Sequence, residues 1–460
     1  MRILLTTLFC CFFTFSFSQN KEEVRKIWVA FVDKASPAFS IDEPETFLSP
    51  RAIQRRQRQS IAIDSTDFPV NPIYLDSLKT LGATIHSTSK WLNAVSIIVS
   101  NSMEKKIEQL DFVQSTKYVG KNLNKFLLLR REDKVRDSLP EVFLMENDYG
   151  HAEAQIKMLN GDFLHNQGFK GKGIWIAVLD GGFSNVDIMP FFDSLRINNR
   201  LIFQKDFVDG DDFVYESSSH GSKVLSTMAA NYPGLMVGTA PDATYICLKT
   251  EDTRGEYLIE ECNWVAGLEY ADSLGVDVVN SSLGYTTFSD SAMDYAYENL
   301  DGKTGIATRA ATFASQKGMI VVNSAGNEGD GKWKHIDIPA DAENILTVGA
   351  VKSNGQRASF SSIGPASDGR IKPEVVALGQ RAATASVYGA KVNHSRGTSF
   401  SSPIIAGMVA ALWQAFPNQT NQEIMQAIIQ SSSQVDTPDN ELGYGIPDFR
   451  LAYQLLKSKQ

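Results

Sequence analysis

A serine, a histidine and an aspartate stand at positions where each could take part in acyl-transfer chemistry. Ser399 lies in Gly397-Thr398-Ser399-Phe400-Ser401-Ser402-Pro403, directly before an apolar run of helical length. His220 opens a helical segment of small residues, and Asp180 ends an apolar strand. A hydroxyl, an imidazole and a carboxylate can serve as nucleophile, general base and orienting group. Each residue alone is more often a helix cap, a loop residue or a turn residue, so their combination carries the interpretation.

An amide donor joins this set. Asn327 directly follows an apolar strand that ends in Asn323-Ser324-Ala325-Gly326. Its side chain could bind the negative oxygen that develops on an attacked carbonyl, and the helix start at Ser399 also favours negative charge. The chain order Asp, His, Asn, Ser differs from the Ser, Asp, His order of α/β-hydrolases.

Metal and dinucleotide chemistry have weaker support in the sequence. The six histidines form no His-Glu-x-x-His motif, so zinc catalysis is not predicted. Gly168, Gly171 and Gly173 precede a strand instead of following it, which argues against a dinucleotide-binding turn. We expect no cofactor to be required for the chemistry. The loop with Asp209, Asp211 and Asp212 is a candidate for a stabilising calcium ion, and a solvated acidic turn is the alternative.

The elements that must position these residues indicate an α/β fold. Short apolar runs without alternation predict strands buried on both faces, with helical segments between most of them. We therefore expect a doubly wound, mostly parallel sheet, whose chemistry lies at the carboxyl ends of the strands. The predicted strands are 174–179, 244–248, 276–279, 319–322 and 345–348.

Four regions are predicted along the chain. Residues 1–18 have the apolar run and small-residue end of a signal peptide, which predicts a secreted or periplasmic protein with no membrane span after signal removal. Residues 19–120 alternate strand and helix patterns, as in a small α+β domain. The charged stretch 121–148 is expected to be a linker with a processing region, and 149–460 the catalytic domain.

Charge differs between the two predicted domains. Residues 19–145 carry a net charge of +3 and residues 146–460 a net charge of −13. This division argues against nucleic acid as a partner and suits a contact between the two parts. The basic helix 49–58, with Arg51, Arg55, Arg56 and Arg58, is expected to present a solvated face.

Two cysteines remain after the predicted signal peptide. A bridge between Cys247 and Cys262 would close a loop of about 15 residues and contribute about 3 kcal/mol. Against this, Cys262 falls on one apolar helical face with Leu258, Ile259, Val265 and Ala266, as a buried free thiol would. The sequence leaves both alternatives open.

The motifs around these residues resemble those of subtilisin-like serine proteases, the subtilases. The matching motifs are Ala177-Val178-Leu179-Asp180-Gly181-Gly182, His220-Gly221-Ser222, Ser281-Ser282-Leu283-Gly284, Ser324-Ala325-Gly326-Asn327 and Gly397 to Pro403. The resemblance covers about residues 150–457 and implies an exported endopeptidase that acts on proteins or peptides through an acyl-enzyme. It also implies that the N-terminal domain is a propeptide that assists folding, inhibits the enzyme and is removed by self-processing.

The resemblance assigns roles to the site residues. It implies that Ser399 is the nucleophile, His220 the base and Asp180 the orienting carboxylate, with Asn327 and the Ser399 N–H binding the oxyanion. Ser282, Leu283 and Gly284 resemble a strand that pairs with substrate, and Ser324, Ala325 and Gly326 resemble the opposite pocket wall. The chain departs from the family pattern at Gly181, where a hydroxyl residue is usual, and at Ser222, where threonine is usual.

The small residues of the two walls predict a preference for a large apolar residue before the cleaved bond. Glu328, next to Asn327, is expected at the pocket rim, where basic residues would be tolerated and acidic residues disfavoured. Two alternatives to an endopeptidase remain. One is a catalytically impaired binding or scaffold protein with this fold, suggested by Gly181. The other is an esterase or peptide ligase with the same triad.

Overall fold

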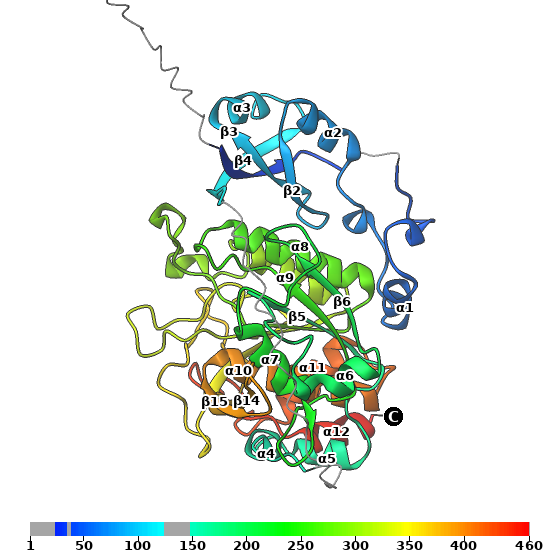
Figure 1. Ribbon diagram of the computed structural model, residues 1–460, viewed down its shortest axis with the longest axis vertical. Helices are drawn as coiled ribbons and strands as arrows, with labels where there is room; N and C mark the ends of the chain where they lie inside the picture. The colour runs from blue at the N-terminus through cyan, green and yellow to red at the C-terminus, as the bar shows by residue number, and fades with distance from the viewer. Residues whose placement is uncertain (1–23, 35–37, 124–147, 460) are drawn as a thin grey trace, which may run out of the picture.

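Two β-sheets, one parallel and one antiparallel, organise the chain in a computed structural model that describes residues 24–34, 38–123 and 148–459. The smaller N-terminal domain lies against one side of the larger α/β domain (Figure 1). The predicted signal peptide and most of the predicted linker lie outside the described residues.

The large sheet confirms the predicted architecture. Its seven strands follow the order β13-β12-β11-β10-β5-β9-β6, and neighbouring strands pair in parallel. The strands are β5 (Trp175–Asp180), β6 (Leu201–Asp206), β9 (Thr244–Lys249), β10 (Val278–Ser281), β11 (Ile320–Ser324), β12 (Leu346–Val351) and β13 (Val375–Leu378). The sequence pattern missed β6 and β13. β6 is a half-exposed edge strand, and β13 has only four residues, so neither forms a long apolar run.

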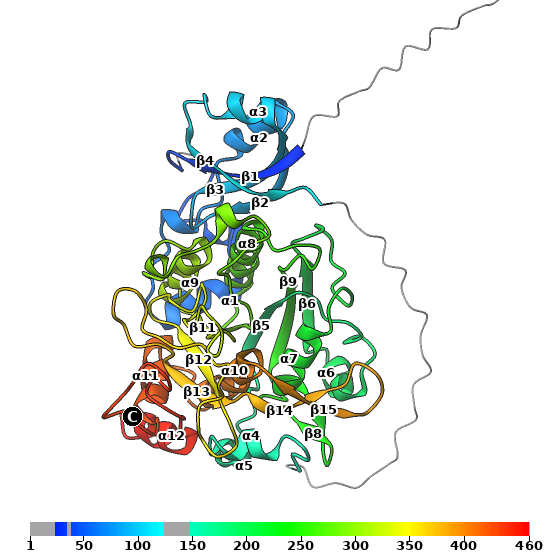
Figure 2. The same cartoon turned by 90° about the vertical axis from the view of Figure 1, so that its left-hand side faces the viewer.

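Helices cover both faces of this sheet (Figure 2). One face packs on α7 (His220–Ala229) and on α10 (Thr398–Ala415), which is buried from Thr398 to Trp413. The other face packs on α8 (Ile259–Leu274) and α9 (Ile306–Gln316). The peripheral helices are α4 (Glu153–Lys157), α5 (Gly161–Asn166), α6 (Asp193–Ile197), α11 (Asn421–Gln430) and α12 (Phe449–Lys457). Two antiparallel strand pairs also lie outside the large sheet: β7 (Asn231–Tyr232) with β8 (Met236–Val237), and β14 (Gln380–Ala385) with β15 (Val392–Arg396).

The antiparallel sheet of the N-terminal domain has two apolar faces. Its order is β2-β3-β1-β4, formed by β1 (Val24–Phe31), β2 (Thr84–Ser89), β3 (Ala94–Ser100) and β4 (Val113–Lys121). Alternation along β1 turns Ile27, Val29 and Phe31 into a core covered by α2 (Pro72–Thr80) and α3 (Asn101–Ile107). Trp28 points to the other face and packs with the cluster around α8. The N-terminal domain thus has its own core and a second face that packs against the larger domain.

The basic helix α1 (Pro50–Arg58) corrects the expectation of a solvated face. Arg55 and Arg56 are 2% and 0% exposed, because α1 docks against the C-terminal end of α8. Both arginines form ion pairs with Asp272 in the last turn of α8, and Arg55 also donates to the Val276 carbonyl. A helix C-terminus carries partial negative charge, so these cations also complement the α8 dipole. The sequence showed the charges of α1 but not their partners.

Further polar contacts extend this interface along α8. Lys90 Nζ lies 2.7 Å from Asp272 Oδ2, and the Glu269 carboxylate accepts from the N–H groups of Lys90 and Trp91 at 2.7 and 3.1 Å. His86 Nε2 lies 2.9 Å from Asn263 Oδ1. Burial would raise the pKa of Asp272, but the positive charges of Lys90, Arg56 and Arg55 outweigh it and hold that pKa below its usual range. The charged groups of this interface therefore depend on both domains.

The two cysteines are free thiols, which is one of the two alternatives that the sequence left open. Both are buried, and no disulfide joins them. Cys247 belongs to the core on the α10 face of the sheet, whereas Cys262 belongs to the core on the α8 face. The sheet itself therefore separates the two sulfur atoms.

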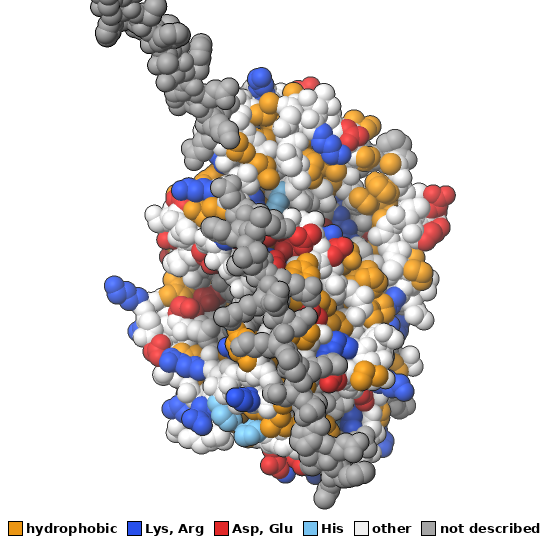
Figure 3. Space-filling view, viewed as in Figure 1, with side chains coloured by type: hydrophobic (Ala, Val, Ile, Leu, Met, Phe, Trp, Pro, Cys, Tyr) orange, Lys and Arg blue, Asp and Glu red, His pale blue; other side chains and the backbone are white. Residues whose placement is uncertain are grey.

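Charged side chains of both signs are mixed on the surface of the two domains. On the face in Figure 3, lysine and arginine side chains are scattered among acidic ones over both domains. Among the described residues, no helix has the length and apolar character needed to cross a bilayer.

Candidate active site

Asp180 and His220 meet at the carboxyl edge of the large sheet. Asp180 is the last residue of β5 and His220 the first of α7. The Nδ1 atom of His220 lies 3.0 and 2.8 Å from the two carboxylate oxygens of Asp180, which is 1% exposed. Burial disfavours the imidazolium, but the charge and hydrogen bond of Asp180 outweigh it, so the pKa of His220 is raised above its usual value. The pair leaves Nε2 as the nitrogen that can accept a proton.

Ser399 stands in the first turn of α10. Gly397 precedes the helix with a φ of 147°, a conformation that favours glycine, and it turns the chain sharply into α10. As the second residue of the helix, Ser399 has an N–H with no acceptor one turn earlier. Its Oγ donates to the Ser282 carbonyl at 3.4 Å, a long hydrogen bond that leaves the hydroxyl weakly held. The rings of His220 and Phe400 are 5.8 Å apart, which brings the imidazole beside this turn.

A buried polar network fixes the start of α10. Ser282 Oγ donates to the Ser399 carbonyl at 2.9 Å and accepts from Asn280 Nδ2 at 3.1 Å. Ser402 Oγ in turn donates to Asn280 Oδ1 at 3.0 Å. The sequence pattern did not identify Asn280 or Ser402. The only signal was that Asn280 interrupts an apolar strand, and Ser402 follows Ser399 by three residues on the same side of the helix.

Asn327 lies beside the first turn of α10. Its Oδ1 accepts from the backbone N–H of Thr398 at 2.9 Å. Because Asn327 Oδ1 is bound to the Thr398 N–H, the Nδ2 group of the same side chain points away from that backbone segment. Asn327 is exposed, so Nδ2 can donate to a substrate atom. The Ser399 N–H and Asn327 Nδ2 thus come from neighbouring backbone segments at the same edge.

The two predicted substrate walls lie next to each other. Asn323 Nδ2 and Ser324 Oγ donate to the Leu283 carbonyl at 3.3 and 3.5 Å, which links the segment 282–284 to the segment 324–326. Ala325 is buried, whereas Gly284 is exposed. Glu328 is half-buried, and its Oε2 accepts from the Asn327 N–H at 2.7 Å and from Ser362 Oγ at 3.2 Å.

The sequence pattern missed one acidic residue between these walls. Asp337 belongs to Ile336-Asp337-Ile338-Pro339, a segment outside the motifs and strands predicted from the sequence. Its N–H donates to the Ala325 carbonyl at 3.1 Å, and the side chain is buried.

The two departures from the family pattern have local explanations. Gly181 supplies no hydroxyl, but its N–H donates to Asp180 Oδ1 at 2.7 Å. Ser222 keeps a hydroxyl, which donates to the Ser184 carbonyl at 2.7 Å. Asp180 therefore accepts hydrogen bonds from both a backbone N–H and the imidazole of His220.

The predicted calcium ligands do not form one site. Asp211 Oδ1 accepts from a backbone N–H of its own loop, and the Asp212 side chain is 79% exposed. Asp209 pairs with Arg254 at 3.1 Å and with Lys249 at 3.8 Å. Asp209 also groups with Asp206 and Glu216, whose carboxylate ligand atoms lie within 4.8 Å of one another, so among the three predicted residues only Asp209 belongs to a cluster that could hold an ion in the described part of the chain.

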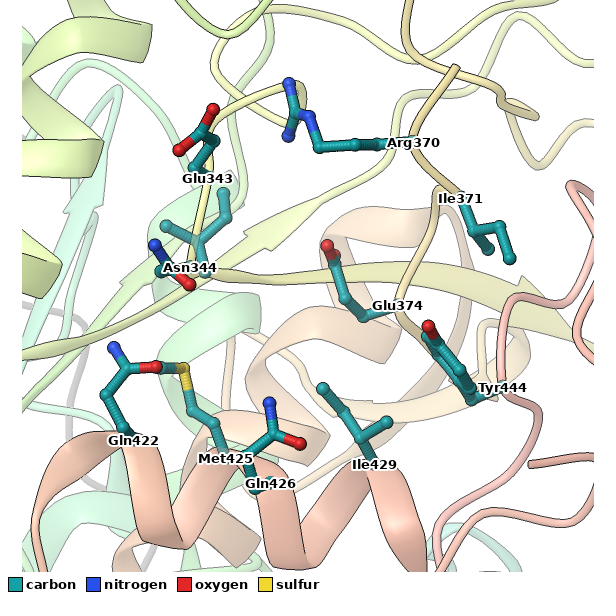
Figure 4. Close-up of a pocket in the computed structure, with 11 residues that line it drawn as sticks. Glu343, Asn344, Arg370, Ile371, Glu374, Gln422, Met425, Gln426, Ile429 and Tyr444 are labelled. Carbon is teal, nitrogen blue, oxygen red and sulfur yellow. The ribbon is translucent and has the colours of Figure 1, made fainter. Parts of the chain in front are cut away.

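A separate cavity of about 350 Å³ lies away from these residues (Figure 4). It is lined by Glu343, Asn344 and Arg370 before strands β12 and β13, and by Gln422, Met425 and Ile429 of α11. These residues are at the amino ends of the strands, so the cavity is on the edge opposite Asp180.

Comparisons with known proteins agree with this geometry. Residues 171–445 match the subtilase family, and residues 26–137 match a peptidase S8 propeptide domain of Bacteroidota. Subtilisin NAT of Bacillus subtilis subsp. natto and subtilisin E of Bacillus subtilis (strain 168) are each 32% identical over 296 residues, covering 62% of this chain and 68% of theirs. The crystal structure of MycP1 with the N-terminal propeptide removed has a TM-score of 0.52 at 22% identity, covering 65% of this chain and 96% of that one.

Proposed function

Because the chain belongs to the subtilase family and is a serine endopeptidase, we propose that Ser399 is its nucleophile, His220 its general base and Asp180 the orienting carboxylate. The observation that carries this assignment is the pairing of His220 Nδ1 with both Asp180 oxygens beside the start of α10. The same pairing argues against a scaffold protein that has lost catalysis, despite the glycine at position 181.

The proposed reaction proceeds through an acyl-enzyme. Ser399 Oγ leaves its long hydrogen bond to Ser282 and attacks the peptide carbonyl carbon, while His220 Nε2 takes the hydroxyl proton. Asp180 stabilises the imidazolium that results. His220 then gives the proton to the leaving amine, the C–N bond breaks, and water hydrolyses the ester by the same steps.

The oxyanion is bound by two donors. As the carbonyl becomes tetrahedral, its oxygen takes a negative charge, and the Ser399 N–H and Asn327 Nδ2 can both donate to it. The hydrogen bond between Asn327 Oδ1 and Thr398 N–H fixes the amide before substrate arrives, so little reorganisation is needed.

We infer further that the N-terminal domain is an inhibitory propeptide of an exported, self-processing zymogen. Its match to a propeptide domain and its docking on α8 support this role. The apolar N-terminus, read as a signal peptide, supports export. The proposed substrates are proteins and peptides.

Replacing the nucleophile tests this function. Ser399→Ala should lower kcat by about 10⁶-fold, the figure known for loss of the subtilisin nucleophile. Folding should be unchanged, because among the described residues Oγ makes only the long hydrogen bond to the Ser282 carbonyl. Casein and peptide turnover would be measured beside the melting temperature. Turnover retained in a folded Ser399→Ala variant would contradict the assignment.

A further inference from the structure

A buried acidic side chain lies between the two walls that flank the proposed nucleophile. The segment Ile336–Ile338 runs between them: Tyr285 N–H donates to the Ile338 carbonyl at 2.8 Å, and Asp337 N–H donates to the Ala325 carbonyl at 3.1 Å. One wall begins at Ser282, whose carbonyl accepts from Ser399 Oγ, and the other ends at Asn327. Both walls therefore contact the segment that carries Asp337, and both lie next to the start of α10.

The glycines of both walls face this aspartate. A Cβ atom placed on Gly284 would lie 2.7 Å from Asp337 Cβ, and one placed on Gly326 would lie 2.3 Å from Asp337 Oδ2. Any larger residue at either position would collide with the carboxyl group. From the absence of side chains at these glycines, the sequence predicts room for a large apolar substrate residue. In the structure, the room beside the glycines is instead taken by the side chain of Asp337.

The Asp337 carboxyl group lacks a full set of hydrogen-bond partners. Asp337 is 6% exposed, and its Oδ1 has no hydrogen-bond partner in the described part of the chain. A buried polar atom without a partner costs about 1–3 kcal/mol, so such a group is uncommon without a functional cause. A ligand that brings hydrogen-bond donors into this space would remove that cost.

The electrostatic surroundings favour a cation as that ligand. Burial, the nearby negative charge of Glu328 and a side-chain hydrogen bond with Glu328 raise the pKa of Asp337 well above its usual value, while a side-chain hydrogen bond with Trp333 lowers it. Glu328 is the charged group whose field acts on Asp337, and it too is negative. A positive charge beside the unpartnered Oδ1 of Asp337 would let this carboxyl group ionise and would also be attracted by Glu328.

Length selects among cationic side chains. Two extended residues, about 6.5 Å, separate Ser282 from Gly284, so a side chain must be long to reach Asp337 from the cleaved bond. Lysine and arginine combine that length with a terminal charge. We propose that Asp337 forms the base of the pocket for the residue before the cleaved bond and selects lysine or arginine there. This inference rests on the proposed function and replaces the apolar preference expected from the walls alone.

Peptide cleavage by the mature enzyme, obtained by self-processing of the expressed full chain, tests the selection. Peptide substrates would be identical except for Lys, Arg, Phe, Leu or Glu before the cut. Wild type should show a higher kcat/KM for Lys and Arg than for Phe. Asp337→Asn keeps the shape and removes the charge, so it should lower the Lys-to-Phe ratio by about 10- to 100-fold. Asp330→Asn, an exposed acid outside the walls, should leave the ratio unchanged.

A binding measurement keeps the inference separate from catalysis. Benzamidine is a small cation, and benzamide is its neutral counterpart. Benzamidine should raise the melting temperature of full-chain Ser399→Ala more than benzamide does, and adding Asp337→Asn should remove the difference. Preferred cleavage after Phe or Leu, an unchanged ratio in Asp337→Asn, or equal shifts with both compounds would overturn the inference. Loss of all turnover with the benzamidine shift intact would instead contradict only the proposed function.

Discussion

The catalytic edge and the contact between the two domains bury polar groups in different ways. Around the start of α10, Asn280, Ser282 and Ser402 connect through neutral hydrogen bonds, and Asp180 pairs with His220. All of these residues belong to the catalytic domain. At the interface, Arg55 and Asp272 are fully charged groups from different domains.

This difference predicts which polar contacts persist when the two domains separate and which are lost. Neutral hydrogen bonds within one domain remain satisfied whether or not the propeptide is present, so the edge can be preorganised in the free enzyme. The interface groups lose their partners when the domains part, and each charge must then be solvated by water. The catalytic domain is therefore expected to keep its site after the propeptide leaves, whereas the docking of the propeptide depends on its buried charges.

At the catalytic edge, removal of the Asp180 charge is expected to lower kcat more than loss of the Asn327 amide. Asp180→Asn should lower kcat by about 10⁴-fold, because the imidazole loses its orienting charge. In wild type, kcat/KM should rise with pH as His220 loses its proton, with a midpoint above the ordinary histidine value of about 6.5, since Asp180 raises the pKa. In Asp180→Asn the midpoint should fall.

Lys223 supplies a control of opposite sign for that pH profile. Its charge lowers the pKa of His220, so Lys223→Gln should move the midpoint upward. Midpoints that stay fixed in both variants would show that the profile reports another group.

Asn327 tests whether the edge stabilises charge or only holds α10. Asn327→Ala should lower kcat by about 10²–10³-fold, as loss of one oxyanion donor does in subtilisin. Asn327→Asp keeps the oxygen that accepts from Thr398 but loses the N–H donor, so it should be impaired at least as much. If Asn327→Asp instead retained wild-type kcat, the side chain would act only by holding the helix.

Arg55 tests the interface side of the comparison. Arg55→Ala in a separately added propeptide, residues 19–123, should weaken inhibition of the mature enzyme by about 10²-fold or more, because breaking a buried ion pair costs at least about 3 kcal/mol. Lys79→Ala, which removes an exposed cation paired within the propeptide, should change the inhibition constant little. Equal effects of the two variants would mean that the buried charges do not determine docking.

The fold and the candidate site differ in how far the sequence predicts them. Unbroken apolar runs and the motifs around Asp180, His220 and Ser399 predicted the parallel sheet and the subtilase family, and both are confirmed. The buried state of Arg55 was predicted wrongly, because charge pattern along one helix does not reveal a partner more than 200 residues away. Asp337 was missed for a similar reason, since the glycines that face it, Gly284 and Gly326, lie on two other segments of the chain.

Fluorophosphonate labelling of the mature enzyme tests the central claim most directly. The reagent reacts with a serine hydroxyl only where a base and oxyanion donors activate it. Peptide mapping should place the single modification on Ser399, with no labelling in Ser399→Ala and slower labelling in Asp180→Asn. Labelling of another serine, such as Ser401 or Ser402, or no labelling of an enzyme that still cleaves peptides, would contradict the proposed mechanism.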